Sequence, residues 1–180
     1  MALSKDQIVE AALAVADESG LEAVTMRAVA ARVGASPMAL YRHLADKEEL
    51  LDGVLELVLS EVALPDPSLS WDLRLLELAD GLRAVAHRHP ATMGLVFSRP
   101  GDTPGVRKAV AVTIGALAEA GVSPSQLNRL ERMLSTFVVG FALSEVSGRF
   151  PRDQQEDLGR EFAADLLDLV GVVRAKGGTA

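Results

Sequence analysis

Apolar residues recur every three or four positions along most of this chain, and glycines, prolines and capping residues interrupt the pattern at intervals. The pattern predicts helices over residues 4–18, 25–33, 37–43, 46–62, 71–89, 90–97, 104–120, 124–147 and 154–174. Aromatic residues make up only 4% of the chain, and Ala, Leu and Val supply most of its apolar content. This composition favours close-packed helices over a β-sandwich or barrel, so we predict an all-α fold.

Residues 24–50 predict two short helices joined by a tight turn. Thr25 and Ser36 stand where side chains cap helix N-termini, and Pro37 occupies a first helical position, where its missing N–H costs nothing. Gly34 can adopt the left-handed conformation that ends a helix. Only two residues separate the first helix from the next cap, which is the joint that a helix-turn-helix requires.

The second helix of this pair has two different faces. Leu40 and Leu44 lie one turn apart and are expected to point inward. The residues left facing outward are Met38, Ala39, Tyr41, Arg42 and His43. Exposed aromatic, basic and small side chains on a short helix suit the DNA major groove. The alternative is a small helical corner with a solvated face and no ligand.

These positions carry a family resemblance. The run T-x-R-x-V-A-x-x-V-G-x-S-x-x-x-L-Y-x-H-x-x-x-K-x-x-L, from Thr25 to Leu50, resembles the DNA-binding domain of the TetR family of transcriptional repressors. The resemblance covers about the first third of the chain. It implies an all-helical homodimer with an N-terminal three-helix DNA-binding domain at residues 1–47. A C-terminal helical bundle at 48–180 would bind a ligand and dimerise, with 48–62 as the connecting helix.

The residues expected to meet DNA are Thr25, Arg27, Ser36, Pro37, Met38, Ala39, Tyr41, Arg42, His43 and Lys47. Arg42 and His43 are candidates for hydrogen bonds with base edges or phosphates. The resemblance implies that Tyr41 and Lys47 contact phosphates. Thr25 and Arg27 would contact the flanking DNA backbone. Met38 and Ala39 offer apolar contacts to thymine methyl groups. A two-fold dimer would read a near-palindromic operator.

Charge is distributed unevenly along the chain. The net charge is −7, but residues 20–47 hold four Lys or Arg against two acids, which gives +2 and leaves −9 for the rest. A locally basic segment on an acidic body can still bind phosphates where contact is made. We therefore expect weak non-specific binding and greater reliance on base contacts.

Residues 64–70, with two prolines and two serines, form the one clear break in the helical pattern. Beyond it, Trp71 to Glu145 is similar to the C-terminal domain of the tetracycline repressors, through S-W, F-S-R-P-G and A-G-V-S. The similarity implies a small molecule bound inside the helix bundle. Candidate lining residues are Leu78, Leu82, Met93, Leu95, Val96, Phe97, Val110, Thr113, Ile114, Met133, Phe137 and Phe141. For each of them, ordinary core packing is the alternative.

The sequence departs from the tetracycline repressors at one position. Those proteins hold a Mg²⁺–drug chelate with a histidine just before the R-P turn, where this chain has Leu95. His87 and His89 are two residues apart and would face different ways on a helix. We expect no metal, no cofactor and an effector more apolar than tetracycline. Three polar residues on otherwise apolar helices, Thr113, Thr136 and Glu145, either orient that ligand or satisfy backbone groups.

Two features of the C-terminal half concern assembly. The segment 104–120 is apolar nearly all round and is expected to be buried on every side at the centre of the body. The helix up to residue 147 carries two apolar faces and needs two partners, one of which would be a second subunit. The alternative is that the last two helices complete a monomer core. The final residues, 176–180, look disordered.

Several classes of protein fit the sequence poorly. The absence of cysteine excludes disulfides, zinc fingers and thiolate catalysis. No apolar run approaches the ~20 residues of a membrane span and no signal peptide opens the chain, so we expect a cytoplasmic protein. No nucleophile elbow, phosphate loop or H-E-x-x-H motif supports an enzyme. A helical interaction module without DNA binding stays open, as does the choice between repressor and activator.

Overall fold

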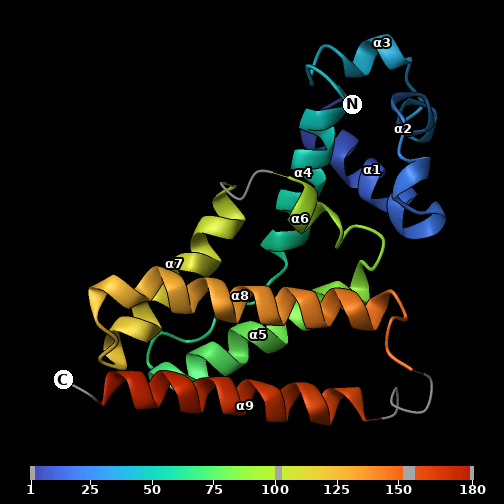
Figure 1. Ribbon diagram of the computed structural model, residues 1–180. Helices are drawn as coiled ribbons and strands as arrows, with labels where there is room; N and C mark the ends of the chain where they lie inside the picture. The colour runs from blue at the N-terminus through green and yellow to red at the C-terminus, as the bar shows by residue number, and fades with distance from the viewer. Residues whose placement is uncertain (1–2, 100–102, 152–156, 179–180) are drawn as a thin grey trace. The chain divides into compact units, whose positions relative to one another are not determined.

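The computed structural model describes residues 3–99, 103–151 and 157–178, and within these ranges every regular element is a helix (Figure 1). The predicted all-α fold is confirmed. The chain packs into two compact units. We call Met1–Glu61 with Arg88–Pro104 the head, and Val62–His87 with Gly105–Ala180 the body. No helix in the described ranges is long and apolar enough to cross a membrane.

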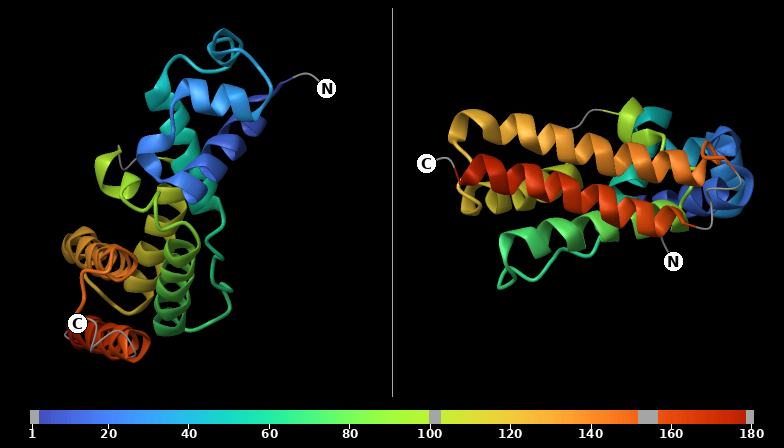
Figure 2. Two further views of the ribbon diagram at one scale, coloured as in Figure 1. Left: turned by 90° about the vertical axis from the view of Figure 1, so that its right-hand side faces the viewer. Right: turned by 60° about the horizontal axis from the view of Figure 1, so that its bottom comes forward.

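The head consists of short helices around a small apolar core. They are α1 (Lys5–Ser19), the 3₁₀ turn η1 (Leu21–Ala23), α2 (Met26–Arg32), α3 (Pro37–Leu40), α4 (Lys47–Ser60) and α6 (Leu95–Ser98). Helix α1 packs on α4, α2 packs on α3, and α6 contacts α4. The core includes Ile8, Val29, Leu40, Leu50 and Val54, which are fully buried. Figures 1 and 2 show α3 at the outer edge of the head.

Side chains cap the helices of the head, among them the two predicted caps at Thr25 and Ser36. Ser4 and Gln7 form a capping box, because each side chain accepts a hydrogen bond from the backbone N–H of the other. The Thr25 hydroxyl accepts from the N–H of Ala28 at 3.1 Å, and Ser36 likewise caps α3. Gly34 has φ of +67°, the left-handed conformation expected between α2 and α3.

The second helix of the pair is shorter than the pattern predicts. Regular α3 ends at Leu40, and residues 41–43 form a tightened turn. In this turn the N–H of Arg42 donates to the carbonyl of Ala39 at 3.3 Å, and that of His43 donates to Leu40 at 2.9 Å. Hydrogen bonds from an N–H to the carbonyl three residues earlier tighten the last turn of a helix.

The segment after α5 (Trp71–Arg88) also differs from the prediction. We expected a helix over residues 90–97, but the chain makes a turn there and only Leu95–Ser98 is helical. Both the N–H and the hydroxyl of Thr92 donate to the carbonyl of His89, at 3.1 and 3.0 Å. This local bonding by a threonine competes with the helical pattern and closes a turn instead.

In the part of the body that the structure describes, four long helices form a bundle. They are α5 (Trp71–Arg88), α7 (Pro104–Glu119), α8 (Pro124–Val146) and α9 (Leu158–Gly177), of which Arg88 and Pro104 belong to the head. Helices α8 and α9 run side by side (Figures 1 and 2). One core cluster gathers around Leu117 and Leu134, and the other gathers around Phe162.

The expectation that the 104–120 helix is buried on every side is wrong for this chain. Thr113, Ala116 and Leu117 of α7 are buried, whereas Ala111 and Ala118 are exposed. The error has a simple source, because small apolar residues contribute little area and tolerate exposure. Apolar composition around a helix therefore overstates its burial where alanine supplies it.

The predicted disorder of the last residues is wrong in part. Helix α9 continues to Gly177, well past the expected end at residue 174. Gly177 lies against the loop after α7, where an added Cβ would stand 1.7 Å from the carbonyl oxygen of Ala120. Only glycine permits this approach, which brings the end of α9 close to the loop after α7. Residues 179–180 lie outside the described ranges.

Candidate nucleic-acid interface

The two leucines of the helix-turn-helix point inward, as predicted. Leu40 is fully buried and Leu44 is 2% exposed, and both belong to the head core that includes Val29. Burial of Leu40 within α3, and of Leu44 just after its last turn, fixes the rotation of α3. The opposite face is therefore left for solvent or a ligand.

The predicted DNA-contacting residues lie on the surface of the head. Ala39 and Lys47 are half-buried, and the exposed members are Thr25, Arg27, Ser36, Pro37, Met38, Tyr41, Arg42 and His43. Met38 is 73% exposed and Tyr41 is 48% exposed, both large apolar surfaces on a very short helix. Together with the neighbouring basic side chains, they form an exposed surface that is open to a ligand.

Cations of the head separate into two groups. Lys5, Arg32, Arg88 and Arg99 each pair with a carboxylate. In the described ranges, the three other cations have no ion-pair partner, and they are Arg27, Arg42 and Lys47. All three unpaired cations belong to the predicted DNA-contacting set. Their positive charge is thus available to an external anion, while that of the other cations is compensated within the chain.

Asp46 and Glu49, at the N-terminus of α4, have the spacing of a capping box, but only one of its two hydrogen bonds is present. Asp46 caps the helix by accepting from the N–H of Glu49 at 2.8 Å, as expected. The Glu49 carboxylate, however, accepts from the N–H of Ala45 at 2.7 Å and from Lys5 at 2.5 Å. These hydrogen bonds, the Ala45 bond foremost, lower the pKa of Glu49. Lys5 is thereby held by a carboxylate.

Arg99, which the sequence did not single out, joins the segment after α6 to α4. Its Nε donates to Asp52 Oδ1 at 2.6 Å, and its other nitrogens bind the side chain and the carbonyl of Glu48. The Arg99 side chain is only 10% exposed. The hydrogen bonds that Arg99 donates to Asp52 and, next in size, to Glu48 raise the pKa of Arg99 and keep it charged. Its partners lie about fifty residues away, so no local pattern marks it.

The predicted effector residues divide between the two units. Four lie in the head, where Met93 and Leu95 are 2% exposed, Val96 is half-buried and Phe97 is 56% exposed. The others lie in the body, and they are Leu78, Leu82, Val110, Thr113, Ile114, Met133, Phe137 and Phe141. Phe137 and Phe141 pack on Phe162, with ring centroids 5.9 and 5.1 Å apart. This contact makes core packing part of their role.

Two of the polar groups singled out in the body, Thr113 and Glu145, have intramolecular partners, whereas Thr136 is exposed. The Thr113 hydroxyl donates to the carbonyl of Ala109 at 3.0 Å. Glu145 accepts two hydrogen bonds from Arg83, at 2.8 and 2.6 Å, and lies 3.0 Å from His87. Burial raises the pKa of Glu145, but these partners outweigh it, so the pKa is lowered and the group stays ionised. Sequence analysis missed Arg83, whose partner lies 62 residues away.

A helix-turn-helix that exposes unpaired cations, on a head joined to a separate helical body, defines a DNA-binding regulator. Comparison with known families agrees. Residues 8–54 match the family described as bacterial regulatory proteins, tetR family, and residues 75–170 match the tetracyclin repressor-like C-terminal domain. The chain belongs to the TetR family of transcriptional regulators.

Individual relatives support this assignment. An HTH-type transcriptional regulator of Saccharopolyspora erythraea is 30% identical, across 98% of this chain and 77% of its own length. BioQ of Mycobacterium smegmatis is 30% identical with a TM-score of 0.85, over 97% of this chain and 100% of BioQ. ActR of Streptomyces coelicolor, in its apo form, is 26% identical with a TM-score of 0.84, over 99% of this chain and 98% of ActR. Similar structures also include BioQ with its DNA operator and ActR with actinorhodin.

Proposed function

We propose that the protein is a repressor that binds a palindromic operator as a homodimer and is released by a small-molecule effector. The observation that carries the proposal is the set of unpaired cations at Arg27, Arg42 and Lys47, in a head whose other cations are compensated. BioQ, a similar protein, has been crystallised with a double-stranded DNA operator. A regulator of this kind would act in the cytoplasm.

In the proposed complex, α3 and the turn after it enter the major groove of one half-site. Arg42 and His43 reach base edges or phosphates, and Met38 contacts thymine methyl groups. Tyr41 and Lys47 contact phosphates. Residues 1–47 would then bind DNA, with 48–62 as the connection and the remainder of 48–180 serving the effector and the dimer. These ranges divide the chain by proposed binding role. The head and the body divide it by packing, so their bounds differ.

Replacing Arg42 with Ala is expected to weaken operator binding by about 5- to 150-fold, because a base contact by arginine contributes about 1–3 kcal/mol. The matched control is Arg32→Ala, since Arg32 is paired with Glu18 at 2.6 Å and lies outside the predicted contacts. Fluorescence anisotropy would measure the affinities of both variants for an operator that the wild-type protein selects from random DNA. Equal affinities for the two variants would remove Arg42 from the interface.

The proposed effector is a largely apolar molecule bound without a metal ion. Leu95 stands where the tetracycline repressors place their metal-binding histidine, and a leucine cannot ligate an ion. The predicted lining is dominated by aliphatic and aromatic side chains, which suit an apolar ligand. ActR, similar to this chain over its whole length, has been crystallised with actinorhodin.

The proposed dimer forms through α8 and α9. Both helices expose large apolar side chains, with Met133 at 42%, Leu167 at 57% and Val172 at 42%. Replacing Leu167 with Glu is expected to convert dimers to monomers, because burying a carboxylate in an apolar interface is costly. Sedimentation velocity would measure the mass. The control is Leu64→Glu, a residue 51% exposed and outside both helices. A dimer that survives Leu167→Glu would contradict this interface.

A further inference from the structure

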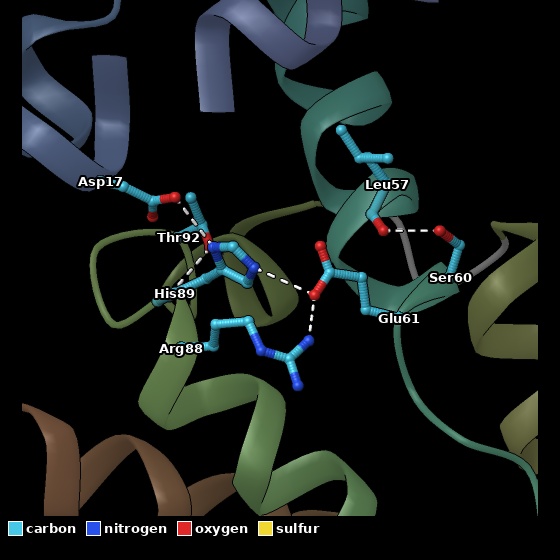
Figure 3. Close-up of polar contacts among 7 residues, drawn as sticks. All are labelled: Asp17, Leu57, Ser60, Glu61, Arg88, His89 and Thr92. Atoms are coloured by element: carbon cyan, nitrogen blue, oxygen red, sulfur yellow. Dashed lines mark hydrogen bonds and ion pairs between the residues drawn. The ribbon is translucent and has the colours of Figure 1, made fainter. Parts of the chain in front are cut away.

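His89 occupies a buried position between two carboxylates in the head (Figure 3). Its side chain is 8% exposed, with Nδ1 2.9 Å from Asp17 Oδ2 and Nε2 3.2 Å from Glu61 Oε2. Asp17 lies near the end of α1, and Glu61 directly follows α4. Arg88 also pairs with Glu61, but its side chain is 54% exposed. A single imidazole thus connects the C-terminal ends of two helices distant in the sequence.

The positions of the two ring nitrogens suit a ring that carries a positive charge. An ionised carboxylate only accepts hydrogen bonds, so a ring nitrogen that faces one has to donate. Both nitrogens of His89 face carboxylate oxygens, and only imidazolium donates from both. Burial raises the pKa of Glu61, but the hydrogen bonds from Arg88 and His89 outweigh it and lower the pKa. Glu61 is accordingly an anion in this arrangement.

The two helix ends also need a cation. The carbonyl groups at a helix C-terminus carry partial negative charge, which favours basic residues there. Neither α1 nor α4 has a basic residue in its last turn, and Asp17 and Glu61 add further negative charge. In the described ranges, His89 is the sole ion-pair partner of Asp17. His89 brings positive charge to both helix ends, although it lies 72 residues after Asp17 and 28 residues after Glu61.

We propose that His89, as an imidazolium, is a positioning residue for operator recognition that fixes the crossing of α1 and α4. This inference rests on the proposed function, because α4 carries the predicted phosphate contact Lys47 at its other end. Helix α4 has 14 residues and is about 21 Å long, so each degree of tilt at Glu61 moves its N-terminus by about 0.4 Å. A tilt of a few degrees would displace the contact by more than a hydrogen bond tolerates.

The test compares three variants of the full chain in operator binding and in thermal unfolding. His89→Gln keeps a hydrogen-bonding side chain but removes the charge, and it is expected to weaken operator binding about tenfold. Neutralising the stranded carboxylate in Asp17→Asn/His89→Gln is expected to return affinity to within about threefold of wild type. The control Arg88→Gln removes the exposed cation on the same Glu61 oxygen and should stay within about threefold.

The rescue separates charge compensation from simple packing, because neutralising Asp17 fills no space. Wild-type affinity in His89→Gln, or a double variant that binds no better than the single one, would overturn the proposal. If His89→Gln fails to fold, a folded and binding double variant supports the inference and an unfolded one refutes it. A wild-type protein without an operator would defeat the proposed function instead. The unfolding temperatures of the variants are expected to follow the same order as their operator affinities. They would still test the connection that His89 makes between Asp17 and Glu61.

Discussion

Leu40→Ala is expected to destabilise the head by about 2–5 kcal/mol, the usual cost of removing a fully buried leucine side chain. Leu40 is 0% exposed and holds α3 against the core of the head, which also includes Val29. The loss should appear as faster amide hydrogen exchange in α2 and α3, because a local opening exposes these amides first. Operator binding should fall with it, since α3 would lose its fixed orientation.

The matched control lies on the same helix. Met38→Ala removes a side chain that is 73% exposed, so the stability of the head should change by no more than about 0.5 kcal/mol. If Leu40→Ala left hydrogen exchange in α2 and α3 as slow as in Met38→Ala, the orientation of α3 described above would be wrong.

Phe162→Ala is expected to cost the body about 3–5 kcal/mol. Phe162 is 1% exposed and centres one of the two core clusters. Its ring contacts Phe137 and Phe141, and the Arg83 guanidinium lies 5.5 Å from its centroid. The substitution would therefore remove aromatic, aliphatic and cation–π contacts together.

Trp71 gives this prediction a clean readout. It is the only tryptophan and it packs on a core cluster of the body, so its fluorescence reports unfolding of that unit. The control Phe97→Ala makes the same chemical change at a side chain that is 56% exposed and belongs to the head. Equal denaturation midpoints for the two variants would contradict the role assigned to Phe162.

Sequence reasoning succeeded where the determining interactions are local. The caps at Ser4, Thr25 and Ser36 each bond to an amide three residues away, so residue type and spacing suffice to predict them. The left-handed Gly34 and the inward turn of Leu40 are local in the same sense. These features define the helix-turn-helix, and together they made the DNA-binding head predictable.

It failed where the partner lies far along the chain. His89 meets Asp17 across 72 residues, and Arg99 meets Asp52 across 47. The spacing of residues 88–99 does not indicate that this segment packs with the head. The domain boundary predicted at residue 47 places residues 88–99 in a different domain from residues 1–47. The burial of α7 was overestimated for a different reason, because alanine is apolar but covers little surface.

The measurement that tests the central claim most directly is selection of bound sequences from a random double-stranded DNA pool, using the purified wild-type protein. The account predicts enrichment of a near-palindrome whose two half-sites match, because a two-fold dimer presents two equal heads. The Arg42→Ala variant should enrich it weakly or with relaxed preference at one position in each half-site. A folded protein that enriches no sequence would contradict the assignment of the unpaired cations at Arg27, Arg42 and Lys47 to DNA.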